Sequence, residues 1–559
     1  MTQPDHLSEP TVRERAGEAP GEIVPGTADT DRPTTSSDVP FLVEQNGTTA
    51  LAGDGFVWPV RFPDISGGLE TQADRYLALA ASLDDVELRN VVLGSISLLV
   101  AMQTYLEAAV YLQAAAARGQ RFVGLPPEAE FLDGDGDLDT LPPPFSSRAT
   151  AAGQSPPLSR LREIKITAQW NRLSVLRALY APQIVTITTN SLVKQAALAA
   201  EQAVRFRFIW NVFNARREPG PHYRIDCRPI AETIAELAIA SALVSGGYAD
   251  RLRQLVRREA ELALSITAAN LCRLSGMADL PANLWSGTGG YYPSRLIGLE
   301  VMRRGGSARR FGHGLNAGIL YRHQKPFRIA ELAVSSQFTV PTKAFAELMD
   351  EERVLAETPE PFRPAILWGQ GDPHFRIGQP GRTRARHNGR RRVLYAPTPP
   401  RGFRQYLSPQ LPDAVYRNWQ FRLVQMLDRL PIDLVCTLHP REREARAQHP
   451  AARFADVAAA GFEDLLQDAD VVLFDYLKST TVALALPSDK PVVVIDLERL
   501  AFEPVALARL QERCQIISPD YDERGRPVVD QQELEDALCG SHAAPDPGYF
   551  RRLYVGDGN

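Results

Sequence analysis

The residues that most constrain the fold are two short apolar runs late in the chain, Val471–Phe474 and Val492–Ile495. Runs of valine and isoleucine without alternation are typical of strands that are buried on both faces. A polar turn and a short segment of small, helix-forming residues, Val482–Leu486, separate the two runs. Strand, helix and strand in this order predict a right-handed parallel βαβ unit. We therefore expect an open α/β sheet in this half of the chain.

The polar turn of this unit is the first candidate ligand site. Open α/β sheets bind their ligands at the carboxyl ends of parallel strands, which is where this turn would lie. Its hydroxyl side chains precede a predicted helix, whose free N–H groups favour phosphate. We expect the turn to bind a diphosphate, with a simple helix N-cap at Ser479 as the alternative. The turn contains Asp475, Lys478, Ser479, Thr480 and Thr481.

The same pattern continues on both sides of this unit. Apolar runs at Val393–Ala396, Asp433–Leu438 and Cys514–Ser518 predict further strands, with helices between them. Thr398 and His439 closely follow the first two of these runs. Because parallel strands end at one edge of their sheet, both side chains are expected near the hydroxyl-rich turn.

An earlier series of motifs predicts a second sheet. Short strands are expected at Ile184–Thr188, Ala282–Trp285 and Ser307–Phe311. A glycine-rich loop follows the second of these strands, and glycine allows a backbone to come close to a ligand. The loop matches neither of the common phosphate-binding glycine patterns. Gly287 and Gly289 are its candidate ligand contacts.

Length and composition indicate how the chain is divided. A chain of 559 residues is too long for one core. Residues 1–54 are polar and are expected to form a disordered tail. A stretch rich in Pro, Gly and Arg, 346–390, is expected to be a linker. It would join an N-terminal domain, 55–345, which is unusually helical, to a C-terminal domain, 391–545, with a short tail, 546–559.

Charge and cysteine usage narrow the classes of function. The net charge of −5 gives no general attraction to nucleic acid. The five cysteines are far apart, which argues against a zinc site or a disulfide framework and fits a reducing, cytoplasmic compartment. The longest apolar run, Val91–Met102, is too short to span a membrane. The arginine run Arg382–Arg392 allows a peripheral contact with the inner face of a membrane, with a solvated loop as the alternative.

Four groups of motifs, taken in order, resemble GT-B glycosyltransferases. More narrowly, they are similar to the CDP-glycerol glycerophosphotransferase group and to bacterial surface-carbohydrate transferases. RRFGHGLNAG, with ELAVSSQF after it, resembles the HG turn and the serine-bearing segment of that group. RRVLYAPTPPRG, LVCTLHP and ADVVLFDYLKSTTVALALPSDKPVVVID resemble segments of its donor domain. The resemblance covers residues 280–500, and the hydroxyls follow the DY pair at a greater distance than is usual in the group.

The resemblance implies an α/β fold with two Rossmann-like domains and a metal-independent transferase without a cofactor. The enzyme would move a sugar or polyol-phosphate from a CDP-, UDP-, GDP- or CMP-linked donor to a glycan or lipid-linked acceptor in surface polysaccharide or capsule synthesis. His313, with Gly314 beside it, would be the general base, and His439 with residues 479–481 would hold the donor diphosphate. A histidine suits this role because its ordinary pKa is about 6.5.

Two other functions are compatible with the same architecture, because a fold does not define a function. One is an isomerase of the nucleotide-sugar 2-epimerase type. The other is a non-catalytic protein that binds a nucleotide sugar. Release of free nucleotide in the presence of an acceptor would favour the transferase, whereas conversion of the nucleotide sugar without an acceptor would favour the isomerase.

Overall fold

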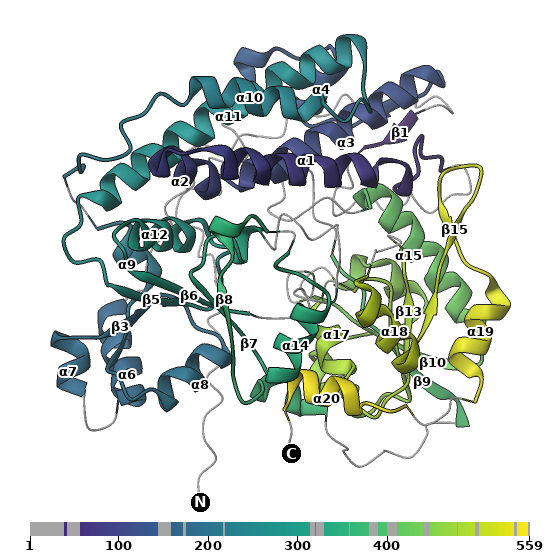
Figure 1. Cartoon of the computed structure of the whole chain (residues 1–559). Helices are drawn as coiled ribbons and strands as arrows, with labels where there is room; N and C mark the ends of the chain where they lie inside the picture. Colours follow the sequence, from purple (N-terminus) through teal and green to yellow (C-terminus); the bar gives the residue numbers. More distant parts are fainter. Residues whose placement is uncertain are drawn as a thin grey trace, which may run out of the picture.

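The chain is α/β and, within the described residues, forms two six-stranded parallel sheets and two small two-stranded sheets (Figure 1). The predicted α/β class is therefore confirmed. The computed structural model describes residues 38–41, 56–142, 158–171, 175–215, 218–312, 319, 329–356, 358–378, 389–399, 411–439, 442, 446–477, 479–497, 502–541 and 545–556.

The first large sheet has the strand order β4–β3–β5–β6–β7–β8. The connection from β3 to β4 runs in one direction along the sheet, and the connections from β5 to β8 run in the other. Right-handed crossovers of opposite direction place their helices on opposite faces. Accordingly, α12 (Tyr292–Arg303) lies above this sheet and α8 (Ser191–Ala199) below it in Figure 1. The strands are β3 (Ile184–Thr186), β4 (Val204–Phe206), β5 (Asn283–Ser286), β6 (Ser307–Phe311), β7 (Gln337–Val340) and β8 (Ala365–Trp368).

The second large sheet has the strand order β11–β10–β9–β12–β13–β14. Numbered along the chain, this order is 3-2-1-4-5-6, in which the direction of growth reverses between the first and the fourth strand. The reversal point therefore lies between β9 and β12, which are paired neighbours. The strands are β9 (Arg391–Tyr395), β10 (Ile432–Thr437), β11 (Asp456–Ala458), β12 (Val471–Phe474), β13 (Val492–Ile495) and β14 (Cys514–Ile517).

Helices from residues 63–133 and 228–275 form a layer that extends above both sheets in Figure 1. The stretch that reads as one apolar helix after residue 86 is two helices, bent by 53° where they meet. Among the described residues no single helix is long and apolar enough to cross a membrane, and this pair passes that test only when its two members are joined. The layer contains α1 (Pro63–Ser82), α2 (Val86–Gly94), α3 (Ser97–Ala117), α4 (Pro127–Asp133), α10 (Arg228–Ile239) and α11 (Gly246–Ser275).

Other helices cover the sheets or connect their strands. Helices α6 and α8 lie on the lower side of the first sheet in Figure 1, and α15 lies beside the second. These elements are α6 (Ser159–Asn171), α7 (Val175–Tyr180), α9 (Ile209–Phe213), α14 (Lys343–Glu351), α15 (Asp413–Asp428), α16 (Phe462–Leu466), α17 (Thr480–Ala485), α18 (Pro504–Arg513) and α19 (Gln531–Cys539).

The last helix, α20 (Gly548–Tyr554), returns to the first sheet. Thr342 Oγ1 donates to Leu553 O at 2.7 Å, and the backbone N of Asp372 donates to Tyr554 O at 2.8 Å. The ring of Tyr554 packs against Phe345 at a centroid distance of 5.8 Å. One hydrophobic core consequently runs from β7 and α14 through α20 to β12 and α17.

Two expected boundaries differ from the structure. The range 546–559, expected as a tail, contains α20, because three of its apolar residues are buried against the first sheet. The range 346–390, expected as a linker, contains β8, which pairs with β7 through backbone hydrogen bonds.

Candidate functional site

Three of the predicted site segments meet at the carboxyl edge of the second sheet. Thr398 follows β9, His439 follows β10 and residues 475–481 follow β12. Because β9 pairs in parallel with both β10 and β12, the three segments leave neighbouring strands at the same edge. This edge includes the reversal point of the sheet, where ligands bind in open α/β folds.

Asp475 is the centre of a buried hydrogen-bond network at the reversal point. Its carboxylate accepts hydrogen bonds from Tyr395 Oη at 2.6 Å, from Tyr416 Oη at 3.0 Å and from Trp419 Nε1 at 3.1 Å. Burial raises the pKa of Asp475 to about 6, and the three donors partly offset this effect. The network joins the end of β12 to β9 and to α15, so Asp475 stabilises the carboxyl edge of the second sheet.

The same network fixes the segment that follows β9. The backbone N of Thr398 donates to Tyr416 Oη at 3.0 Å, and Gln420 Nε2 donates to Thr398 O at 3.3 Å. Both backbone groups of Thr398 are thus bound by α15. A ligand at this position would meet the side-chain hydroxyl rather than the backbone.

The hydroxyl-rich turn contains a helix cap. Ser479 is the N-cap of α17, and its Oγ accepts from the backbone N of Thr481 at 3.3 Å. The two side-chain hydroxyls of these residues lie 2.7 Å apart, whereas Thr480 between them is exposed. The capping role that the sequence allowed is therefore observed. Phosphate binding by this turn stays a prediction.

A charged cluster that no motif in the sequence predicts lies beside the end of β10. The buried guanidinium of Arg417 donates to Gln420 Oε1 at 2.7 Å and forms an ion pair with Glu442. The backbone N of Glu442 donates to His439 O at 2.9 Å. Burial, together with the charge of Arg417, lowers the pKa of His449 to about 3. In the sequence Glu442 and His449 stand in a polar, arginine-rich stretch that is typical of a solvated loop.

The glycine loop of the first sheet is bound by an internal carboxylate. Glu331 accepts from the backbone N of Gly289 at 2.6 Å, from the backbone N of Gly290 at 3.0 Å and from Thr288 Oγ1 at 2.5 Å. A Cβ atom at Gly289 would collide with Ala330 O, so this position requires glycine for packing alone. Gly287 belongs to the same loop and its N donates to Thr188 Oγ1 at 2.9 Å. A ligand at the amides of Gly289 and Gly290 would have to displace Glu331.

Several predicted residues lie outside the part of the chain that the structure describes. They are His313, Gly314, Lys478 and residues 382–388 of the arginine run. Two described arginines of that run begin β9. Arg391 Nη1 donates to Leu538 O at 3.2 Å, and Arg392 Nε lies 3.8 Å from Asp433 Oδ2.

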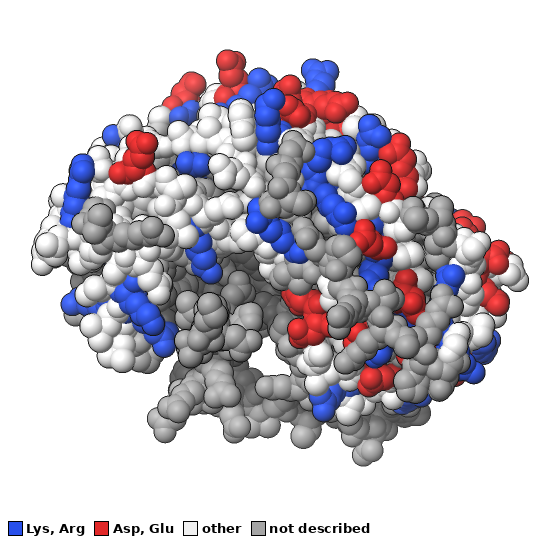
Figure 2. Space-filling model, turned by 90° about the horizontal axis from the view of Figure 1, so that it is seen from below, with Lys and Arg blue, Asp and Glu red and all other residues white. Residues whose placement is uncertain are grey.

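Charges of both signs are mixed on the surface. Figure 2 shows the described basic and acidic residues interspersed on the face seen from below. Among the described residues, no group of three or more His, Cys, Asp or Glu side chains is placed to hold a metal ion. Comparison with models of known protein families, with curated proteins and with solved structures finds no match to this chain.

Proposed function

We propose that this protein is a transferase whose nucleotide-activated donor binds at the carboxyl edge of the second sheet, between β9 and β12. The observation that carries this proposal is the strand order, whose reversal point coincides with the predicted donor segments. A dinucleotide-binding, Rossmann-like half of a GT-B fold would have this order. The first parallel sheet would then form the acceptor side.

The contacts at this edge suit a diphosphate leaving group. Charge that develops on such a group must be stabilised by preorganised donors, dipoles or cations. Hydroxyls from residues 479–481, the Thr398 hydroxyl and the His439 ring are the donors that the topology brings to the edge. Preorganisation requires a rigid support. The network of Asp475 supplies it, because it joins β9, β12 and α15 through three hydrogen bonds.

Nucleotide binding is the first test. CDP, UDP, GDP and CMP, each alone and with a linked sugar, are compared by thermal shift, where a ligand at a hundred times its Kd stabilises by about 2.7 kcal/mol. We expect one base to stand out. The double substitution Ser479→Ala with Thr480→Ala should reduce its thermal shift, while Thr233→Ala, an exposed threonine on α10, should not. Unchanged nucleotide affinity in the double variant, or no shift with any nucleotide, would overturn the assignment of the donor site.

Turnover is the second test, and it separates the alternatives. The donor is incubated with and without glycan or lipid-linked acceptors, and free nucleotide is measured. Release only with acceptor supports transfer, conversion without acceptor indicates an isomerase, and binding without turnover indicates a non-catalytic protein. His313→Ala should lower turnover about a hundredfold or more, as expected for loss of a general base, with donor affinity nearly retained. Near wild-type turnover in that variant would place the base elsewhere.

A further inference from the structure

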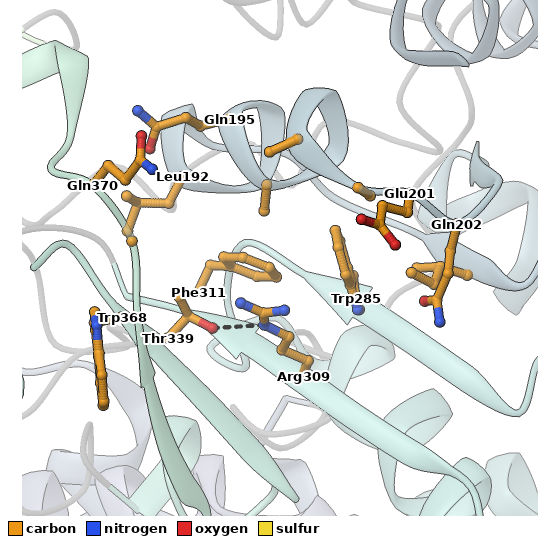
Figure 3. Close-up of a pocket in the computed structure, with 15 residues that line it drawn as sticks. Leu192, Gln195, Glu201, Gln202, Trp285, Arg309, Phe311, Thr339, Trp368 and Gln370 are labelled. Atoms are coloured by element: carbon orange, nitrogen blue, oxygen red, sulfur yellow. Dashed lines mark hydrogen bonds between the residues drawn. The ribbon is translucent and has the colours of Figure 1, made fainter. Parts of the chain in front are cut away.

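The lower face of the first sheet carries a pocket of about 650 Å³ (Figure 3). Its floor comes from β5, β6 and β7, and α8 with the loop to β4 forms one wall. The residues that follow β8 form the far end. The volume falls within the range of about 300–1,000 Å³ that is usual for small-molecule sites. This pocket is separate from the edge of the second sheet that is proposed for the donor.

Arg309 lies in the middle of the pocket, between aromatic side chains (Figure 3). Its Nε donates to Thr339 Oγ1 at 2.7 Å. Its guanidinium carbon lies 5.0 Å from the ring centroid of Trp285 and 4.7 Å from that of Phe311. Within the described part of the chain, neither terminal nitrogen of Arg309 has a hydrogen-bond partner, and no carboxylate forms an ion pair with it. Burial lowers its pKa to about 10, so the group remains charged at neutral pH.

The neighbouring arginine shows that this open arrangement is particular to Arg309. Arg310 points to the opposite face of the same strand, where it is fully buried. Its Nη1 donates to Ser294 Oγ at 2.5 Å, and its Nη2 donates to Ser294 O at 2.6 Å. Arg310 is thus held by the protein through both terminal nitrogens. The two parallel donors of Arg309 instead face the pocket, in the geometry that binds a carboxylate or a phosphate in bidentate fashion.

The rest of the lining contributes amides. Trp368, at one end, pairs with Val340 and not with Thr339, so its exposed ring lies on the face of the sheet away from Arg309. Amide side chains come from α8, from the loop before β4 and from the segment after β8: Gln195, Gln202 and Gln370. Such amides bond the hydroxyl groups of a saccharide. The acidic residue of the lining, Glu201, lies toward the Gln202 end in Figure 3, across from Trp368.

We propose that this pocket binds an acidic saccharide. Its carboxylate or phosphate would lie on the terminal nitrogens of Arg309 and its hydroxyls on the glutamine amides. In the proposed transferase this saccharide would be the acceptor. Only this acceptor role rests on the proposed function, and saccharide binding does not. Gln370 lies close to Asp372, which is bonded to α20, so this end of the pocket adjoins the junction of the two sheets.

Isothermal titration without nucleotide tests the proposal. The probes are a tetrasaccharide of glucuronate and N-acetylglucosamine, maltotetraose with a terminal 6-phosphate, neutral maltotetraose and inorganic phosphate. At least one acidic saccharide should bind about tenfold or more tightly than neutral maltotetraose, and which one does so distinguishes carboxylate from phosphate. Equal binding of acidic and neutral saccharides, or binding of inorganic phosphate alone, would overturn the proposal.

Substitutions then locate the binding. Arg309→Gln should weaken the acidic saccharide about tenfold or more, and Arg309→Lys should recover only part of the loss because a point charge lacks the fork. Arg162→Gln, an exposed arginine on α6, should leave affinity unchanged, and Glu201→Gln should not weaken it. Wild-type affinity in Arg309→Gln refutes the assignment.

Two further measurements keep the test decisive. If Arg309→Gln does not fold, Gln370→Ala replaces it, since this exposed side chain can be removed without opening the core. That variant should bind the acidic saccharide more weakly, and unchanged binding counts against the proposal. The Ser479→Ala with Thr480→Ala double variant should bind the saccharide normally. If this double variant loses nucleotide binding and still binds the saccharide, the result concerns the donor site alone.

Discussion

Asp475→Asn should change how the stability of this protein depends on pH. The pKa of Asp475 is about 6 in the folded chain, against an ordinary value of 3.8, chiefly because the carboxyl group is buried. Between these two values the folded state holds more protons than the unfolded state, so the free energy of unfolding falls as pH rises. At about 1.4 kcal/mol per pH unit, the loss across this window is about 3 kcal/mol. The asparagine variant keeps the shape of the side chain and has no proton to lose, so its free energy of unfolding should not fall in this way.

The assay is urea unfolding of both proteins at pH 4, 5, 6 and 7, followed by circular dichroism. The buried His449 works in the opposite direction, because its lowered pKa makes the folded state more stable as pH rises toward 6.5. The wild-type profile alone therefore mixes two effects. The difference between the variant and the wild type removes the histidine contribution. That difference should shift by about 2.4 kcal/mol in favour of the variant from pH 4 to pH 7, and parallel profiles would refute the reasoning.

Two further stability predictions follow from buried polar groups. Glu331→Gln puts an amide N–H where the carboxylate accepts three hydrogen bonds, so it should lower the free energy of unfolding by about 1–3 kcal/mol. The control, Glu347→Gln on an exposed side chain, should change it by less than about 1 kcal/mol. Equal effects of the two substitutions in urea unfolding would contradict the role of Glu331 in holding the glycine loop. Tyr554→Ala should cost about 3–5 kcal/mol through the cavity that it leaves between the sheets. Tyr554→Phe should stay within about 1 kcal/mol of the wild type, because the buried hydroxyl has no hydrogen-bond partner among the described residues; a large loss in thermal unfolding would show that this hydroxyl is bonded.

Much of the second sheet could be predicted from the sequence. Its central strands are continuous apolar runs, and β12 and β13 span the same residues as the predicted runs. Such runs are buried on both faces by helices, so their signal does not depend on partners elsewhere in the chain. Short edge strands differ. β4 has three residues, and β8 has two adjacent half-buried positions between two exposed ones, so neither shows a clear period.

The sites were less predictable because the roles of their residues depend on contacts with residues far away in the chain. The strand SARRF places two consecutive arginines on opposite faces. Arg310 donates to Ser294 on α12, whereas Arg309 donates to Thr339 on β7 and directs its guanidinium into the pocket. Similarly, Asp475 stands in the predicted ligand turn, but its partners on β9 and α15 make it a support of that turn. A single sequence shows residue types, and it does not show these pairings.

The return of α20 to the first sheet makes the first half of the molecule a discontinuous folding unit. A fragment that stops before β9 would lack the helix that covers Phe345 and that accepts hydrogen bonds from Thr342 and Asp372. If the two halves were expressed as separate genes, the first half would therefore expose an apolar surface. The second half would carry α20 without the sheet against which it packs. A circular permutant that begins at β9 and joins residue 556 to the start of the helical layer would instead keep α20 next to the sheet it covers.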